Sequence, residues 1–345
     1  MIAGPMRFQA VMAVLAIGGS VAVTEARDVG RPEPHPVFAF QDETINESSG
    51  LVEHGSHVLT VNDSGAGPDV YVVDRATGET VGRTTYTDDL VVDVEAMAVG
   101  PDETLWVGDI GDNEAHRSSV AVYEMPMPVE GDRTATARRF DLVYAGGPRD
   151  AETLLVHPTT GRLYVVSTGL FGGKVYAAPP TLSSEHANVL RPVAEVGGLI
   201  TDGAFFPDGR FVALRSYSNL TVLETDGWKS VQGMRLPDQD QGEGLAMEPS
   251  GRSVLLSTEG SGSDVLQLPL TSQIIDRVAP AEPSPASASS APSPDVATAG
   301  QPSALEDPAE SDGNSVWEVV ALAAVTLAVA LGVRVWFRRR RTEPS

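Results

Sequence analysis

The chain has 345 residues, a formal net charge of −23 at pH 7 and no cysteine. A charge of this sign repels polyanions, so we exclude nucleic acid as a partner. Without cysteine the chain forms neither a disulfide framework nor a thiolate metal site, so a stable domain has to bury a large apolar core.

The first 26 residues have the pattern of a secretory signal peptide. Arg7 supplies an early positive charge, an apolar run extends from Val11 to Val23, and the small residues Ala22 and Ala26 suit cleavage. We expect a signal peptide over residues 1–26 and a short lead over residues 27–35. The domain that follows is then expected outside the cytoplasm.

A hairpin pattern recurs five times between residues 36 and 276. Each copy has an acidic residue, a short apolar run, a turn with glycine, a second apolar run and a polar tip, as in DVEAMAVGPDETLWVGDIGDN from Asp93. The equivalent acidic residues are spaced by 48, 57, 50 and 41 residues, and they are Glu47, Glu95, Glu152, Asp202 and Glu243. Repeats of this length that contain paired strands are typical of propeller blades.

A third alternating run follows each hairpin, and a fourth run follows four of the five hairpins. The last copy lacks its fourth run, whereas a strand-like segment, PVFAF from Pro36, precedes the first copy. We therefore predict an all-β propeller over residues 36–276, with five four-stranded blades and an N-terminal strand that closes the ring. Six blades, the commoner number in related families, remain the alternative.

Two segments of different composition follow the repeats. Residues 277–315 are rich in Pro, Ser and Ala and contain few large apolar residues, which predicts an extended, disordered stalk. Residues 316–337 are apolar and long enough to cross a bilayer as one helix. The basic tail of residues 338–345 contains four consecutive arginines, which favour the cytoplasmic side. The sequence thus predicts a single-pass membrane protein with an extracellular propeller.

The acidic residues of the repeats are expected at one face of the propeller. The first strand of a blade starts at the face to which the second strand returns, so strand starts and hairpin tips meet at one mouth of the central channel. The acidic residues at the strand starts are Glu47, Asp93, Glu95, Asp150, Glu152, Asp202 and Glu243. The candidate ligand-binding residues at the tips are Asp63, Asp109, Asp112, Asn113, Arg215 and Glu259.

Crowded carboxylates repel one another unless a proton, an arginine or a cation compensates them. Because Ca²⁺ takes about six to eight oxygen ligands, we predict the seven strand-start residues as candidate ligands of this cation. Two structural explanations stay open. Tip residues next to glycine also form Asx-turns, and strand-start carboxylates also accept hydrogen bonds from backbone N–H groups of neighbouring blades.

A family resemblance rests on the motifs ESSGLV, DVEAMAVGPDETLWVGDIGDN, RDAETLLVHPTTGRLYVVS, TDGAFFPDGRFVALRSY and QGEGLAMEPSGRSVLLSTEG. Together they resemble the phytase-like (esterase-like activity of phytase) propeller proteins of actinobacteria. The resemblance extends over about residues 36–270 and implies an acidic, calcium-binding channel mouth. It does not carry over a phytase site, because phytate is highly anionic and this mouth offers only Arg149, Arg215 and Arg117 as cations.

Two functions are compatible with this pattern. The first is a cell-surface binding module that holds Ca²⁺ and recognises a cell-envelope ligand or protein. The alternative is a calcium-dependent extracellular hydrolase, phytase-, esterase- or lactonase-like, in which Glu95 or Glu152 is the general base. The stalk, the membrane anchor and the lack of a defined acid–base pair favour the binding module.

Overall fold

The structure is a computed structural model that describes residues 32–63, 65–87 and 91–279. The internal contacts divide the chain into Met1–Glu282 and Pro283–Ser345, and the described residues belong to the first of these units. The predicted signal peptide, nearly all of the predicted stalk and the predicted membrane span lie outside the described residues. Within the described ranges, no helix has the length and apolar character needed to cross a membrane.

Most described strands form antiparallel groups of four, numbered here in chain order. Group 1 contains β2 (Ser48–His54), β3 (His57–Asn62), β4 (Asp69–Asp74) and β5 (Thr80–Thr85). Group 2 contains β6 (Val94–Val99), β7 (Thr104–Asp109), β8 (Val120–Pro126) and β10 (Arg138–Tyr144). Group 3 contains β11 (Ala151–Val156), β12 (Leu163–Ser167), β13 (Gly173–Ala177) and β14 (Asn188–Val196). Group 4 contains β15 (Ile200–Phe205), β16 (Phe211–Ser216), β17 (Asn219–Glu224) and β18 (Lys229–Arg235).

Group 5 joins the two ends of the described chain. It contains β19 (Gly242–Met247), β20 (Ser253–Thr258), β21 (Asp264–Pro269) and β1 (His35–Ala39). β1 runs antiparallel to β21, with His35 opposite Gln267 and Ala39 opposite Asp264. The prediction that the N-terminal strand completes the last group is confirmed, and the strand starts at His35, one residue before the predicted boundary.

The sequence pattern of each strand reflects its depth in the fold. In β10 the side chains of Phe140, Leu142 and Tyr144 are buried, whereas Asp141 is exposed and Val143 is half-buried, as period-2 alternation predicts for an outer strand with one covered face. In β11, by contrast, every residue is buried. Both faces of β11 are therefore covered, and this strand lies in the interior.

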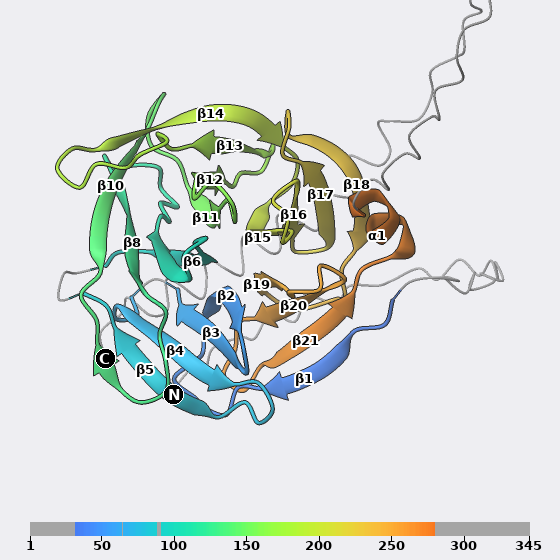
Figure 1. The fold of residues 1–345 in the computed structure, drawn as a ribbon. Helices are drawn as coiled ribbons and strands as arrows, with labels where there is room; N and C mark the ends of the chain where they lie inside the picture. The colour runs from blue at the N-terminus through green and yellow to red at the C-terminus, as the bar shows by residue number, and fades with distance from the viewer. Residues whose placement is uncertain (1–31, 64, 88–90, 280–345) are drawn as a thin grey trace, which may run out of the picture. The chain divides into compact units, whose positions relative to one another are not determined.

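The groups follow one another around a centre, with β2, β6, β11, β15 and β19 innermost (Figure 1). Each of these inner strands contacts the inner strand of the next group, and β19 contacts β2. An apolar cluster lies between every pair of neighbouring groups; the cluster between groups 5 and 1, for example, contains Phe38, Leu51 and Leu255. The described part of the chain therefore has an all-β, propeller-type fold.

Two further elements contact the outer strands, and one further pairing joins groups 2 and 3. β9 (Arg133–Thr134) pairs with β5, and β10 pairs with β14, both in parallel orientation. The helix α1 (Ser272–Val278) contacts β18 and is capped at its start by Thr271. Burial of Ile274 fixes this helix to the domain, so ordered structure continues two residues beyond the predicted boundary at residue 276.

Candidate functional site

Four of the seven strand-start carboxylates lie within the inner strands, and Glu47, Asp93 and Asp150 precede theirs. Glu95, Glu152 and Glu243 are the second residues of β6, β11 and β19, and Asp202 is the third residue of β15. All four have relative exposures of 1% or less, and Asp93 is 8% exposed. Glu47 and Asp150, which precede β2 and β11, are half-buried. Most of these carboxylates thus lie inside the protein rather than on an open channel surface.

Three carboxyl groups meet where group 1 adjoins group 2. Asp63 follows β3, Asp93 precedes β6 and Glu95 lies within β6, and the three residues offer oxygen atoms that lie within 4.8 Å of one another. All three residues are buried. We call them the carboxylate triad. An oxygen-only set of this kind suits a hard cation such as Ca²⁺.

A glycine lets the neighbouring turn approach the triad. A Cβ atom at Gly111 would lie 2.4 Å from Oδ2 of Asp93 and 2.8 Å from Oε1 of Glu95. Any other residue at this position would therefore displace the turn after β7 or both carboxylates. The missing side chain of Gly111 is what allows the two carboxylates and the turn to pack together.

Hydrogen bonds hold the triad from both groups. The hydroxyl of Ser49 in β2 lies 3.1 Å from Oε2 of Glu95 and 2.9 Å from the Glu95 carbonyl oxygen, and it donates toward both. The side-chain amide of Asn113 donates to Oδ2 of Asp93 over 3.3 Å. The backbone N–H of Asp63 donates to the carbonyl oxygen of Glu47. The triad is thus also part of the junction between two groups.

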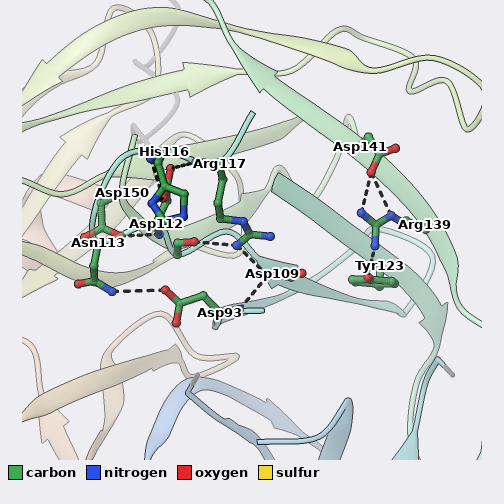
Figure 2. A network of polar contacts seen from close by, with 11 residues as sticks. Asp93, Asp109, Asp112, Asn113, His116, Arg117, Tyr123, Arg139, Asp141 and Asp150 are labelled. Carbon is green, nitrogen blue, oxygen red and sulfur yellow. Dashed lines mark hydrogen bonds and ion pairs between the residues drawn. The ribbon is translucent and has the colours of Figure 1, made fainter. Parts of the chain in front are cut away.

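The hairpin tip of group 2 is organised by Asp109 and Arg117, as Figure 2 shows. Oδ1 of Asp109 accepts a hydrogen bond from the backbone N–H of Asp93 over 3.0 Å and lies 2.8 Å from Nη1 of Arg117. The same Nη1 donates to the carbonyl oxygen of Gly111 over 2.7 Å. Since Asp109 is 1% exposed, its carboxylate serves this internal contact rather than a ligand from solvent.

Asp112 closes the turn that follows β7. Its carboxylate accepts hydrogen bonds from the backbone N–H groups of His116 and Arg117 over 3.0 and 2.9 Å. Its own backbone N–H donates to Oδ1 of Asp150 over 2.9 Å, which ties the tip of group 2 to the start of group 3. Hydrogen bonds from a side-chain carboxylate to nearby backbone N–H groups are those of an Asx-type turn, which was the alternative to ligand binding for these tip residues.

A second charged set lies where group 4 adjoins group 5. Arg215 in β16 is fully buried, and its guanidinium donates to the carbonyl oxygens of Gly244 and Ser257 and to Oε1 of Gln239. Burial lowers the pKa of Arg215 to about 10, although the nearby charges of Glu243 and Asp202 act in the opposite direction. Arg215 is therefore a positive charge inside the protein.

Asp202 accepts hydrogen bonds from the backbone N–H groups of Gly203 and Leu245 over 2.7 and 2.6 Å. Burial raises the pKa of the Asp202 carboxyl well above its ordinary value, and the charge of Glu152 adds to this effect, whereas the two hydrogen bonds and Arg215 oppose it. The Tyr217 hydroxyl lies 3.4 Å from Oε1 of Glu243 and donates to it. Asp202, Glu152, Glu243 and Arg215 form one electrostatic set.

The candidate residues thus do not form one site. They belong to the carboxylate triad, the hairpin tip of group 2 and the charged set around Arg215. Asp63, predicted as a ligand-binding residue, joins the predicted metal ligands Asp93 and Glu95. Among the predicted ligand-binding residues, Asn113 is exposed and Glu259 is half-buried. Four partners of the acidic positions were not predicted, because no repeat or spacing marks them in the sequence: Ser49, Gly111, Gln239 and Tyr217.

Comparisons with known proteins add little to this geometry. No protein-family model and no curated protein matches the chain. Among solved structures, the chain is similar to the PQQ-bound form of an aldose sugar dehydrogenase from Streptomyces coelicolor, with 11% identity and a TM-score of 0.43. The similarity covers 70% of this chain and 99% of that one. At this level we transfer no chemistry from that enzyme, and the resemblance to the phytase-like family stays a prediction.

Proposed function

We propose that the chain is a cell-surface binding module, a five-bladed propeller in which each group of strands is one blade. In this proposal the carboxylate triad holds a cation, Ca²⁺, and the hairpin tips around it bind a cell-envelope ligand or protein. The observation that carries the proposal is the meeting of Asp63, Asp93 and Glu95 within 4.8 Å at a junction between groups. The signal peptide, the single membrane span and the family stay part of the proposal.

The chemistry of the triad supports a hard divalent cation. Three buried carboxylates at this separation repel one another, and a doubly charged ion offsets that repulsion more fully than one arginine does. Carboxylates, backbone carbonyls and water are the ligands that Ca²⁺ prefers. The other strand-start acids are less suited, because Asp202 already accepts two backbone hydrogen bonds and lies near the charge of Arg215.

The hydrolase alternative lacks a specific observation in its favour. Its candidate general bases, Glu95 and Glu152, are 0% and 1% exposed. A general base has to lie within hydrogen-bond reach of the proton it abstracts, directly or through one water molecule. We therefore assign both residues to cation binding or to packing between groups, and not to catalysis.

Cation binding is tested by thermal unfolding of the full chain. A cation that binds the folded state alone stabilises it by about 2.7 kcal/mol at one hundred times its Kd, so Ca²⁺ is expected to raise Tm and EDTA to lower it. The double variant Asp93→Asn/Glu95→Gln is expected to lose this response. The matched control, Asp102→Asn/Glu103→Gln, removes two exposed acids from the turn between β6 and β7 and is expected to keep it.

If the wild-type chain had the same Tm in EDTA and in Ca²⁺, the proposal that the triad binds a cation would be refuted. The triad would then be a structural junction, and the hydrolase would lose its metal as well.

Placement at the cell surface has a separate test. Protease added to intact cells is expected to release a fragment that contains residues before about Ser315, and protection of this fragment would contradict the extracellular placement.

A further inference from the structure

A hollow with a volume of about 430 Å³ opens between groups 3 and 4. Its walls come from the turn between β11 and β12, the start of β12, the loop after β13 and the turn between β17 and β18. Because β11 starts beside the acidic residues and ends at this hollow, the hollow lies on the opposite face of the domain. Its volume falls within the range of small-molecule sites, and the proposed cation site contributes nothing to it.

Two residues of the lining, Tyr164 and His157, pack against aromatic side chains of group 4. The ring of Tyr164 packs against the ring of Trp228 at 5.0 Å and against that of Phe205 at 6.1 Å, and His157 packs against Phe205 at 5.1 Å. The backbone of Trp228 has a φ of 54°, a conformation that is costly for a bulky residue. Packing against Trp228 and Phe205 of group 4 thus fixes Tyr164 in place at the hollow.

The imidazole of His157 is held neutral with one defined tautomer. Its Nδ1 accepts hydrogen bonds from the backbone N–H groups of Thr159 and Thr160 over 3.2 and 3.3 Å, so Nε2 carries the ring hydrogen. Burial lowers the pKa of His157, which favours the same uncharged form. This residue therefore contributes a neutral donor to the lining.

The remaining polar lining combines one cation, one anion and hydroxyl groups. Nε of Arg162 donates to the carbonyl oxygen of Ala178 over 3.0 Å, which orients the guanidinium. Asp226 is exposed at the rim, and Thr160, Thr225 and Pro180 complete the lining. The Thr225 hydroxyl donates toward the carbonyl oxygens of Gly209 and Arg210, each 2.8 Å away. In a chain with a net charge of −23, this hollow is locally balanced in charge.

This lining discriminates between ligand classes. A phosphate or other anion would be attracted by Arg162 and repelled by Asp226, and the reverse holds for a cation. A neutral polyhydroxylated ligand accepts hydrogen bonds from the guanidinium and donates them to the carboxylate, and its C–H faces pack against an aromatic ring. We propose that the hollow between groups 3 and 4 is a saccharide-binding site that takes a neutral mono- or disaccharide.

Titration of the full chain tests this site, in a detergent without a sugar headgroup. The probes are D-glucose, D-galactose, D-mannose and maltose, followed by calorimetry or saturation-transfer NMR, with glycerol and inorganic phosphate as comparison ligands. At least one sugar is expected to bind more tightly than either comparison ligand. Since a hydrogen bond to a charged group is lost, Asp226→Asn and Arg162→Gln are each expected to weaken binding about tenfold.

The matched control is Asp132→Asn, which removes the same charge from an exposed position next to β9, the strand that pairs with β5 of group 1, and is expected to leave the sugar Kd unchanged. Asp226 is exposed, so its replacement keeps the fold and the variant remains a fair test. Failure of all four sugars to bind overturns the proposal. So does tighter binding of phosphate, or sugar binding that Asp226→Asn leaves unchanged. EDTA is expected to have no effect, which separates this site from the proposed cation site.

Discussion

Oδ2 of Asp202 in β15 accepts a hydrogen bond from the backbone N–H of Leu245 in β19 over 2.6 Å. Asp202 lies in the inner strand of group 4, whereas Leu245 lies in the inner strand of group 5, so one side chain ties two neighbouring groups. Arg215 strengthens the same junction by donating to the carbonyl oxygen of Gly244. At this junction an acidic repeat residue acts as a connector between groups.

Replacement of this carboxylate is expected to weaken the junction. Asp202→Ala leaves the buried N–H groups of Leu245 and Gly203 without their acceptor, so we expect a loss of about 1–3 kcal/mol in the free energy of unfolding. Urea denaturation measures the loss. Asp208→Ala is the control, because Asp208 lies in an exposed turn near the other end of β15 and pairs with the exposed Arg210. Equal losses in both variants would contradict a specific role for Asp202.

The closure of the ring could be predicted from the sequence, because it depends on a count of strands. Four hairpins had two further strands and the last had one, so an N-terminal segment with the right alternation was the natural partner, and β1 pairs with β21 as expected. The positions of Glu95, Glu152, Asp202 and Glu243 followed from the same repeat. These features are local or periodic, and a sequence displays such features directly.

The contacts of individual side chains could not be predicted in this way. Arg215 was expected at an open mouth, yet it donates to residues that lie 24–42 positions away and is fully buried. Asp63 at the tip of group 1 meets Asp93 and Glu95 at the start of group 2, and no spacing within one repeat specifies such a contact. The separation into a triad and an arginine-centred set is therefore a property of packing between groups.

Tyr144 gives a prediction about alkaline pH. Burial holds the pKa of its hydroxyl well above the ordinary value of 10.0, with the charge of Asp150 as a smaller contribution. The folded state therefore keeps a proton that the unfolded state loses above pH 10, so stability is fully present below pH 10 and falls as the pH rises further. Tyr144→Phe has no such proton, and its free energy of unfolding is expected to fall less between pH 9 and pH 11.

At pH 7 the same variant is expected to be as stable as the wild-type chain or about 1 kcal/mol more stable. Within the described residues the Tyr144 hydroxyl is buried and makes no hydrogen bond, so its removal costs nothing. The comparison is Tyr71→Phe, in which Arg83 loses a hydrogen bond of 3.0 Å to the hydroxyl, with an expected loss of about 1 kcal/mol. A loss from Tyr144→Phe as large as that from Tyr71→Phe would refute this account.

Arg75 connects the first and last groups on the face opposite the acidic strand starts. It lies after β4 in group 1 and bridges Glu53 of β2 over 3.2 Å and Glu248, which follows β19 in group 5, over 2.5 Å. Arg75→Met leaves two largely buried carboxylates without this partner, and since Arg75 itself is partly exposed we expect a loss of about 2 kcal/mol at pH 7. Lys174→Met, which breaks the exposed pair with Glu195, is expected to cost less than about 0.5 kcal/mol.

The deficit of Arg75→Met is also expected to depend on pH. Burial raises the pKa of Glu53, and the positive charge of Arg75 opposes this rise, so the variant raises that pKa further. The folded variant then takes up a proton more readily than the unfolded chain, and its stability relative to the wild-type chain recovers as the pH falls. Urea denaturation at pH 5 and pH 8 measures the difference, and a deficit that is larger at pH 5 would contradict this charge assignment.

Gly111 provides the sharpest test of the carboxylate triad, because a single methyl group added there meets two of its oxygens. Alanine at this position would place Cβ 2.4 Å from Oδ2 of Asp93 and 2.8 Å from Oε1 of Glu95, distances at which either the carboxylates or the turn has to move. We expect Gly111→Ala to lower the free energy of unfolding by about 1–3 kcal/mol and to abolish the Tm response to Ca²⁺. Gly197→Ala is the matched control, since no atom lies within 4 Å of a Cβ built at Gly197. If Gly111→Ala were destabilised but still melted higher in Ca²⁺ than in EDTA, the cation would bind elsewhere than at Asp93 and Glu95.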